Sequence, residues 1–346
     1  MLAVQKASPE FGLTLADVEI PTLLAGEVLV EVGAAGICGS DLHVYEWTSS
    51  YEWMRPLMPL TVGHEFAGRI VAVASDVDIL SPGQRVTVWP SIPCGRCQSC
   101  QEGEPENCEN KTTIGLTRPG AFAGFVTAPA ANCFDLPDTI DDELAALSEP
   151  LCVGARAVEV GEVRLGHSVI VLGAGMIGLA IALMARRAGA ATVIVVGLDD
   201  EFRLACAQTL GFQHTVDLKT ESLPAAVARI VGGKVDRVFE ATGAAASVRD
   251  GLAVLKRAGL FVATGIHARP VEINLTDLVR NKHQIRGSHG AVRSTWHTVL
   301  RILAQSGEDF RPLITHRLAL SEAVQGFELA RSKAAMKVMV RPDHAS

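Results

Sequence analysis

The sequence predicts a two-domain α/β protein in which a β-rich domain is combined with a parallel sheet and its crossover helices. Its 346 residues exceed what one hydrophobic core usually organises. Hydrophobic residues make up 48% of the chain and charged residues 20%, which is typical of a globular protein rather than a disordered one. The residue pattern also changes near position 150, and this change indicates the border between the two domains.

Short β-strands are predicted before this border. Residues 28–32 alternate between apolar and polar side chains, and residues 69–73 and 84–88 behave similarly. Proline and glycine separate these segments at many positions, so we expect many short elements there rather than long helices.

Strands alternate with helices beyond about residue 166, which predicts a parallel sheet with crossover helices. Glycines 189 and 211 stand where two of these helices should end, in the position that favours left-handed backbone. A helix at 295–305 and a strand at 337–340 follow, and their pattern leaves open which domain they join. The predicted strands are 169–172, 193–196, 235–239 and 260–263, and the predicted helices include 202–210 and 246–255.

The charge balance argues against a nucleic-acid partner, because 38 acidic residues exceed 31 lysines and arginines and the cations do not cluster. The uncharged segment 168–185 contains three glycines, which argue against a membrane span. Residues 1–10 carry one lysine and no apolar segment of signal-peptide length, so we expect a cytoplasmic location.

Four of the eight cysteines lie in one short polar loop: Cys94, Cys97, Cys100 and Cys108. Thiolates three residues apart in a tight turn can bind one tetrahedral ion, and four of them leave no position for water or substrate. Disulfides are not expected in a reducing compartment. The loop therefore predicts a structural zinc site. An iron–sulfur cluster also uses four thiolates and is the competing interpretation, although no second redox motif accompanies it.

A predicted strand leads directly into the glycine-rich sequence Gly173-Ala174-Gly175-Met176-Ile177-Gly178. The first glycine permits the turn, the second admits a pyrophosphate to the backbone, and the third lets the helix pack on the strand. The helix N-terminus offers its free N–H groups to the anion. Because the next strand ends near residue 197, the segment predicts a Rossmann dinucleotide site. Glycines that serve helix packing alone are the competing interpretation.

The choice between NAD and NADP depends on the residues after the second strand of this unit. NAD-binding folds normally carry an acidic residue at the strand end, where this chain has Gly197. Asp199 and Asp200 follow at once and could bind the ribose hydroxyls, and Arg203 is the only cation close by in the sequence. Because both carboxylates would repel a 2′-phosphate, we predict NAD in preference to NADP. Alternatively, the two aspartates simply begin the next helix.

The ends of the two later predicted strands supply three more candidate cofactor contacts, which are Thr242, Thr264 and Gly265. Such positions lie at the carboxyl edge of the sheet, where ligands bind in folds of this kind. The two threonines have two possible roles, which the sequence leaves open. They could contact the cofactor, or they could simply form hydrogen bonds at the strand ends.

Cys38 and His64 are candidates for a second metal site. Cys38 is followed by Ser40 and His43 in the segment 36–43, and His64 is followed by Glu65. A catalytic zinc needs three protein ligands and an open position, and Cys38 and His64 would provide two of the three. A lone cysteine or histidine is more often a packed or hydrogen-bonded residue. The neighbouring glycines, Ser40 and the nucleotide motif favour the catalytic interpretation.

Several segments together resemble the zinc-dependent medium-chain dehydrogenase/reductase family, in the family's order and over essentially the whole chain. Within this family, Glu149-Pro150-Leu151 is similar to the polyol (sorbitol) dehydrogenase branch, and Tyr45-Glu46-Trp47 is similar to threonine dehydrogenases. The resemblance implies a GroES-like catalytic domain of residues 1–152 and 288–346 and a Rossmann domain of residues 153–287. The segments that carry it are 36–43, 63–68, the four-cysteine loop, 148–151, 173–178, 240–243 and 337–339.

The resemblance also implies roles for individual residues. The catalytic zinc would be bound by Cys38, His64 and Glu149. Glu65 would be a nearby carboxylate that ligates in some family members, and Cys152 is the rival for the third position. Ser40 would accept the proton of the substrate hydroxyl and pass it through the cofactor ribose to His43 and solvent. Zinc would lower the pKa of that hydroxyl, and hydride would pass to the nicotinamide.

The implied function is oxidation of a secondary alcohol, such as a polyol, sugar alcohol or vicinal diol, to the ketone with NAD(P). The family resemblance further implies a homotetramer or dimer. The charge balance and the glycines of segment 168–185 already predict no nucleic-acid partner and no membrane span. Threonine 3-dehydrogenase activity is the alternative, weakened because Ser91 and Glu149 stand where bacterial threonine dehydrogenases have histidine and aspartate. A zinc- and nucleotide-binding protein without turnover is a further alternative, but the residues needed for turnover are all present.

Overall fold

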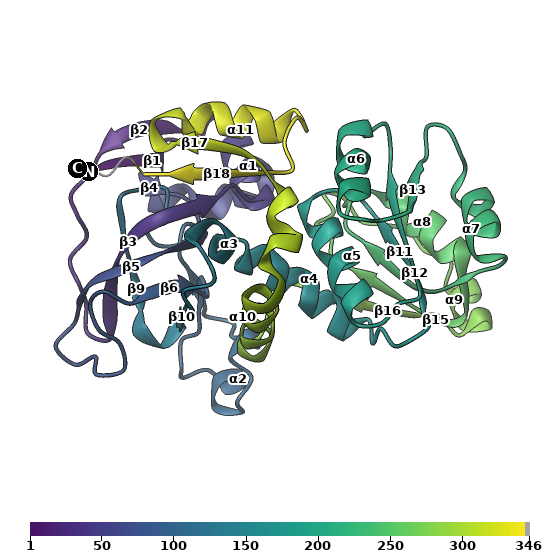
Figure 1. The fold of residues 1–346 in the computed structure, drawn as a ribbon, viewed down its shortest axis with the longest axis horizontal. Coiled ribbons are helices and arrows are strands. Elements are labelled where there is room, and N and C mark those ends of the chain that lie inside the picture. Colours follow the sequence, from purple (N-terminus) through teal and green to yellow (C-terminus); the bar gives the residue numbers. More distant parts are fainter. Residues whose placement is uncertain (343–346) are drawn as a thin grey trace. The chain divides into compact units, whose positions relative to one another are not determined.

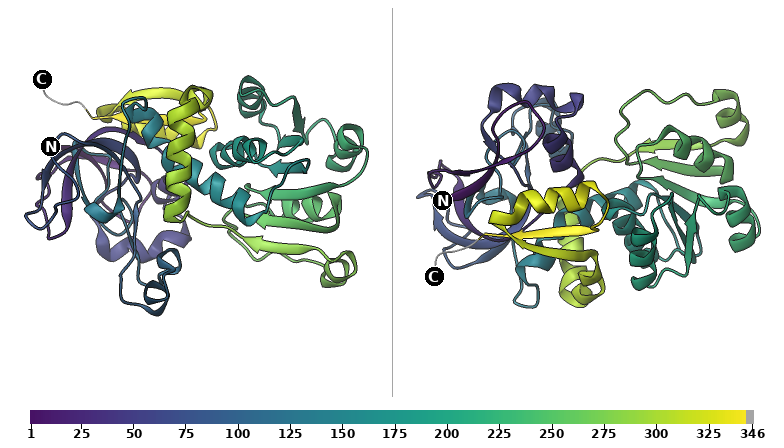
Figure 2. Two further views of the ribbon diagram at one scale, coloured as in Figure 1. Left: turned by 60° about the horizontal axis from the view of Figure 1, so that its bottom comes forward. Right: turned by 90° about the horizontal axis from the view of Figure 1, so that it is seen from above.

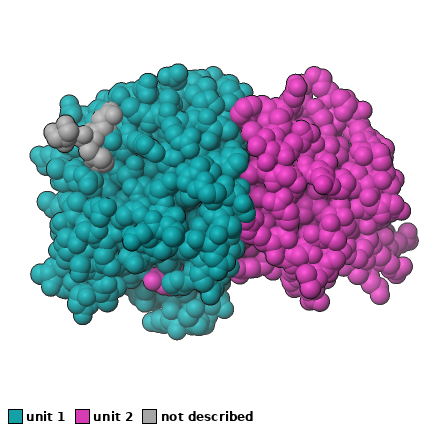
Figure 3. Space-filling model, viewed as in Figure 1, with its two compact units in different colours: residues 1–149, 296–346 teal, residues 150–295 magenta. Residues whose placement is uncertain are grey.

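The computed structural model describes residues 1–342, and the chain divides into two compact units (Figure 3). Unit 1 comprises residues 1–149 and the chain from residue 296 onward, and unit 2 comprises residues 150–295. The sequence placed these borders at 152/153 and 287/288. Both observed borders fall inside helices, α4 (Ser148–Val160) and α10 (Arg293–Ser306), so no break in the helical pattern marks them.

The main sheet of unit 1 has seven strands in the order β10-β6-β5-β3-β18-β17, with β9 also paired to β3. Val28, Val30 and Val32 of β3 are fully buried and alternate with half-buried residues, because successive side chains of a strand point to opposite faces. The strands are β3 (Glu27–Gly36), β5 (Glu65–Val73), β6 (Arg85–Val88), β9 (Phe125–Pro129), β10 (Cys133–Asp135), β17 (Ile314–Ala319) and β18 (Lys337–Arg341).

Smaller elements complete unit 1 (Figure 1). A three-stranded sheet is formed by β2 (Thr14–Asp17), β1 (Leu2–Lys6) and β4 (Leu60–Thr61), and β7 (Ser91–Ile92) pairs with β8 (Thr112–Thr113). Its helices include α1 (Gly39–Glu46), α2 (Gln98–Gln101), α3 (Asp142–Ala146) and α11 (Ala323–Arg331), and the 3-10 helix η1 covers Ser49–Leu57.

The C-terminal segment joins the sheet built by the N-terminal part of the chain. Strand β18 runs antiparallel to β3, with Met339 opposite Gly36. The buried carboxylate of Glu143 in α3 accepts hydrogen bonds from Arg317 and Arg341 of the last two strands. These pairings place the strand predicted at 337–340 in unit 1.

Unit 2 contains one parallel six-stranded sheet in the order β13-β12-β11-β14-β15-β16. Right-handed crossovers that run in opposite directions from β11 place α5 and α6 on one face and α7 and α8 on the other (Figures 1 and 2). The strands are β11 (Ser168–Leu172), β12 (Thr192–Gly197), β13 (His214–Asp217), β14 (Val235–Glu240), β15 (Leu255–Ala263) and β16 (Gln284–Gly287). The helices are α5 (Met176–Arg187), α6 (Glu201–Thr209), α7 (Leu223–Val231), α8 (Ala245–Val254) and α9 (Leu275–Asn281).

The predicted central strands and helices of unit 2 are present, whereas the two edge strands, β13 and β16, were not predicted. Both are short and carry polar side chains, so they lack the compact apolar pattern of a central strand. Gly189 and Gly211 have φ of 95° and 83°, as expected for residues that end helices. Across residues 1–342, no helix combines the length and the apolar character that crossing a bilayer requires.

Candidate active site and metal centres

The four-cysteine loop has the geometry of a closed tetrahedral metal site. The four Sγ atoms lie within 4.8 Å of one another, and Cys97 Sγ is 3.5 Å from Cys100 Sγ and 3.7 Å from Cys108 Sγ. Four sulfurs that each lie about 2.3 Å from one zinc ion would be roughly 3.8 Å apart. None of these cysteines forms a disulfide. The donor set therefore fits the predicted structural zinc.

Backbone N–H groups of the loop favour the thiolate form of its first cysteines. Cys97 N donates to Cys94 Sγ at 3.3 Å, and Cys94 N donates to Cys108 Sγ at 3.2 Å. Hydrogen bonds from the backbone of Arg96 and Cys97 lower the pKa of Cys94 to about 6. A metal that needs deprotonated sulfur therefore meets a loop that already stabilises it.

A second cluster lies at one end of the β3–β5 strand pair. Gly36, the last residue of β3, pairs with Glu65, the first residue of β5. Cys38 is the N-cap of α1 just beyond β3, and His64 immediately precedes β5. The ligand atoms of Cys38, His64 and Glu65 consequently lie within 4.8 Å of one another. A Cβ at position 36 would collide with the Glu65 carboxylate, which explains the glycine there.

Asp41 orients this cluster. Its side chain is fully buried, and Oδ2 accepts a hydrogen bond from Cys38 N at 3.0 Å. Its Oδ1 lies 3.3 Å from His64 Nδ1, while His64 Nε2 lies 3.2 Å from Ser40 Oγ. A carboxylate behind one nitrogen leaves the other nitrogen to face a metal. Burial opposes protonation of His64, but the charges of Asp41 and Cys38 outweigh burial and raise its pKa well above the usual value.

Lys337 brings a buried positive charge to the same cluster. Its Nζ lies 2.5 Å from Glu65 Oε2 and donates to Ile37 O at 2.8 Å. Among the described residues, Glu65 Oε1 is buried without a hydrogen-bond partner. An unpartnered carboxylate oxygen beside a thiol and an imidazole makes a donor set that suits a divalent cation. The residues present therefore fit a catalytic zinc.

Glu149 approaches the cluster from the first turn of α4 but does not belong to the set whose ligand atoms lie within 4.8 Å. Burial raises the pKa of Glu149 to about 7, an effect that His64 opposes and Glu65 reinforces, so its carboxyl is close enough to interact with both. Cys152, the rival third ligand, is fully buried in the same helix. The zinc-ligand role of Glu149 stays a prediction.

The glycine-rich loop of unit 2 has the expected strand–turn–helix geometry. Strand β11 ends just before Gly173, whose φ of 109° favours glycine, and α5 begins at Met176 with Gly175 as its N-cap. A Cβ on Gly178 would collide with the carbonyl oxygen of Gly173, so the helix packs against the turn only because residue 178 has no side chain. Ile177 lies in the first turn of the same helix. These are the features of a pyrophosphate-binding turn.

The strand end that should select the cofactor contains a cation that the sequence did not indicate. Asp199 has a left-handed backbone with φ of 49°, and its N–H donates to Asp217 Oδ1 at 2.9 Å. Lys219 Nζ lies 2.6 Å from Asp199 Oδ1. Arg203 pairs with Asp200 at 3.6 Å. Lys219 is thus a second cation at this strand end, which the chain brings back after β13 and which proximity in the sequence did not reveal.

The ends of β14 and β15 are held together by Glu240, a fully buried carboxylate. Glu240 accepts hydrogen bonds from Thr242 N at 2.6 Å and Gly243 N at 2.9 Å, and it lies 3.0 Å from His267 Nε2. Thr264 Oγ1 donates to Glu240 O at 2.7 Å. The backbone N–H of Gly265 donates to the same oxygen. The threonine hydroxyls thus hold the loops in place, and their contact with a cofactor stays a prediction.

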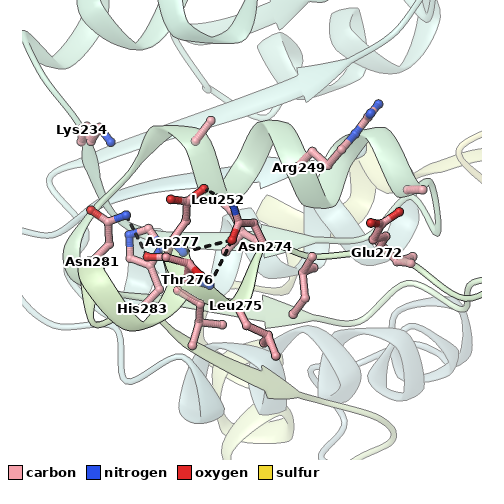
Figure 4. Close-up of a pocket in the computed structure, with 15 residues that line it drawn as sticks. Lys234, Arg249, Leu252, Glu272, Asn274, Leu275, Thr276, Asp277, Asn281 and His283 are labelled. Atoms are coloured by element: carbon pink, nitrogen blue, oxygen red, sulfur yellow. Dashed lines mark hydrogen bonds between the residues drawn. The ribbon is translucent and has the colours of Figure 1, made fainter.

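A cavity of about 1020 Å³ in unit 2 lies away from all these residues (Figure 4). It is bordered by α8, α9 and the segment before α9, where Asn274 caps the helix by accepting from Thr276 N and Asp277 N. Lys234 and His283, which also line it, precede β14 and β16. None of the site residues predicted from the sequence borders this cavity.

Comparison with known families agrees with the two-unit architecture. Residues 24–138 match the model of the alcohol dehydrogenase GroES-like domain, and residues 177–305 match the model of the zinc-binding dehydrogenases. The chain is 34% identical over 343 residues to an L-threonine 3-dehydrogenase of Rhizobium johnstonii, covering 98% of both chains. The chain belongs to the zinc-dependent medium-chain dehydrogenase/reductase family.

Solved structures support this dehydrogenase assignment. The 2R,3R-butanediol dehydrogenase of Bacillus subtilis is 29% identical, with a TM-score of 0.90 over 99% of both chains. A protein of Sinorhizobium meliloti 1021, described as a zinc-binding dehydrogenase and bound to NADP, is 32% identical, with a TM-score of 0.90 over 99% of both chains. The protein is thus a zinc-dependent, NAD(P)-dependent dehydrogenase acting on CH–OH groups, with a GroES-like domain and a Rossmann-type parallel sheet.

Proposed function

We propose that this dehydrogenase oxidises a polyol, sugar alcohol or vicinal diol at a secondary hydroxyl to the ketone, with NAD preferred over NADP. The observation that carries the proposal is the cluster of half-buried Cys38 with buried His64 and Glu65, which has Ser40 at its side. The similarity of Glu149-Pro150-Leu151 to the polyol dehydrogenase branch supports the choice of substrate class.

Cys38 and His64 are the two constant zinc ligands in this proposal, and Glu149 is the third. Glu65 is the alternate carboxylate, because its Oε1 is unpaired while Lys337 holds its Oε2. When bound, zinc would supply the Lewis acidity that lowers the pKa of a substrate hydroxyl. The four-cysteine loop would hold the structural zinc.

Ser40 and His43 serve as the proton path. Both are on α1, and the Ser40 hydroxyl lies 3.2 Å from His64 Nε2, at the edge of the ligand cluster. Ser40 would accept the proton of the substrate hydroxyl, and His43 would release a proton to solvent. A bound nicotinamide cofactor would supply the hydride acceptor.

The preference for NAD is supported by Asp199 and Asp200 at the end of β12, together with the glycine-rich loop. The carboxylate of Asp199 is 68% exposed although it is paired with Lys219, so it can accept a ribose hydroxyl. Thr242, Thr264 and Gly265 complete the proposed cofactor contacts. A homotetramer or dimer is part of the same proposal, as is a cytoplasmic location, since a four-cysteine zinc site needs a reducing compartment.

Threonine 3-dehydrogenase activity is the second candidate, favoured by the 34% identity to the Rhizobium johnstonii protein over nearly the whole chain. The experiment is a panel of secondary alcohols assayed with NAD and with NADP by nicotinamide absorbance. We expect kcat/KM to be highest for a polyol or vicinal diol with NAD. Higher kcat/KM for L-threonine than for every polyol and diol would replace the first candidate by the second.

Removal of the metal with a chelator distinguishes either dehydrogenase from a zinc- and nucleotide-binding protein without turnover. Removal of the catalytic metal should abolish oxidation of every active alcohol, and re-addition of zinc should restore it. Turnover that survived complete removal of the metal would contradict the mechanism.

A further inference from the structure

Three aromatic rings form a row that begins beside Ser40. His43 of α1 stacks on Tyr51 of η1, with ring centroids 6.0 Å apart and an interplanar angle of 18°. Tyr51 in turn neighbours Trp53, at 6.1 Å and 31°. All three residues belong to unit 1, and the row joins the proton path to the exposed end of η1.

The inner part of this row reaches the reaction centre. The Tyr51 hydroxyl lies close enough to Ser40 for the serine hydroxyl to influence the pKa of Tyr51. Burial and the charges of Cys38 and Asp41 raise the pKa of Tyr51 to about 12, so the hydroxyl stays neutral. A neutral phenol next to Ser40 can donate to a substrate oxygen without adding charge to a site that already holds several anions.

The outer part of the row is not needed to anchor η1. Met54 is fully buried and fixes this helix in the core, whereas Trp53 is 48% exposed. Trp296, by contrast, is buried and stacks on Phe134. A large ring that neither fills the core nor lies far from the reacting groups is available to pack against a ligand.

The border of the row is polar and electrically balanced. Thr48 and Ser50 share a hydrogen bond at 3.0 Å, and Glu52 accepts from Trp47 Nε1 at 2.8 Å. Arg55, the cation of η1, pairs with Glu52 at 2.9 Å. Hydroxyls and paired charges around an aromatic surface suit a neutral polyhydroxy compound. They offer no unpaired cation within η1 for the carboxylate of an amino acid.

We propose that Tyr51 and Trp53 form the binding platform for a ring-shaped polyhydroxy substrate, whose C–H face packs on Trp53 while its reacting hydroxyl lies beside Ser40 and Tyr51. A cyclic polyol or sugar ring presents apolar C–H groups on one face and hydroxyls at its edge, which matches an apolar surface with a polar border. This inference rests on the proposed function and narrows its substrate class from polyols in general to cyclic ones.

The test compares myo-inositol, a cyclic polyol, with 2,3-butanediol, a small open-chain diol. Trp53→Ala should lower kcat/KM for myo-inositol at least about tenfold, chiefly through KM, and change that for 2,3-butanediol less than about twofold. Trp53→Phe should restore most of the loss because it keeps an aromatic face. Tyr51→Phe should lower kcat for both substrates, since the proposal places this hydroxyl beside the reacting hydroxyl of the substrate.

The matched control is Phe11→Ala, which removes another exposed aromatic ring of unit 1, one that packs on Tyr45. It should leave both substrates unaffected, and thermal unfolding should confirm that every variant is folded. Equal losses on both substrates in Trp53→Ala, or none on either, would overturn the inference. A wild-type protein that oxidises 2,3-butanediol but not myo-inositol overturns the inference and leaves the proposed function intact. One that oxidises no secondary alcohol overturns both.

Discussion

Cys94 and Cys38 are both candidate zinc ligands in unit 1, but the chain brings their partners to them in different ways. The partners of Cys94 all lie in the same short loop. Those of Cys38 lie at the start of β5, and the buried cation beside them comes from β18. The first site depends on local sequence, whereas the second exists only when distant strands have paired.

The pKa values of the Cys94 and Cys38 thiols are shifted in opposite directions. Backbone N–H groups lower the pKa of Cys94 to about 6. Burial, followed by the charge of Glu65, raises the pKa of Cys38 above its usual value. The Cys94 thiolate is therefore stabilised without a metal, although burial raises the pKa of Cys100 in the same loop to about 12. The cluster around Cys38 needs a cation to hold its anionic ligands. A closed structural site and a reactive one can thus be told apart by what surrounds the sulfur.

Removal of Cys38 should have the largest effect on activity. Cys38→Ser should lower kcat at least about 1000-fold, because the catalytic metal loses a thiolate ligand and the Lewis acidity is worth several kcal/mol. Zinc analysis should show the loss of one ion per chain. The matched variant Cys94→Ser should also lose one ion, but should chiefly lower the thermal stability and retain most of the kcat. Equal losses of kcat in both variants would contradict the distinction between the sites.

The reactivity of the thiols in metal-free protein should differ by about 100-fold at pH 7. Cys94, with a pKa of about 6, is mostly thiolate at this pH and loses reactivity only as the pH falls through 6. The raised pKa of Cys38 keeps it protonated at pH 7, so its reactivity should increase only at alkaline pH. Mass spectrometry after timed alkylation measures both rates in one sample. Similar alkylation rates of Cys94 and Cys38 at pH 7 would show that burial does not control the reactivity of Cys38.

The smallest effect is expected from Asp41, which touches the cluster only through His64 and Cys38. Asp41→Asn should weaken zinc affinity and lower kcat/KM by about 10- to 100-fold, the usual cost of removing a carboxylate behind a metal-bound histidine. Competition with a chelator measures the affinity directly. The four-cysteine ion should be unaffected, and its loss in this variant would indicate misfolding instead. Unchanged affinity at the buried site would remove Asp41 from the proposed metal centre.

The sequence predicted the parts of the site that are coded locally. The spacing of the four cysteines and the glycine-rich loop gave both their geometry and their chemistry, because each works within one turn of chain. Asp41 lies inside the segment 36–43, but no sequence rule predicts that its carboxylate will lie behind His64, which is distant in the sequence. The positions of Lys219 and Lys337 beside the site were not predicted for the same reason. The pairing of distant strands decides which residues lie next to a strand end. Edge strands β13 and β16 were missed because their polar residues resemble loop segments.

The pairing of β18 with β3 has a consequence for biosynthesis. The strand that carries Lys337 is translated after the whole of unit 2, so the last residues of β3, Ala35 and Gly36, lack their β18 partner while the intervening residues are being made. The parallel sheet of unit 2 is contiguous in sequence and can form first. A ribosome-bound chain that stops short of residue 337 would then hold a formed nucleotide-binding fold beside a catalytic half that still exposes an open sheet edge and an uncompensated Glu65. Because of this open edge, we expect chaperones to bind such nascent chains more readily than the finished protein.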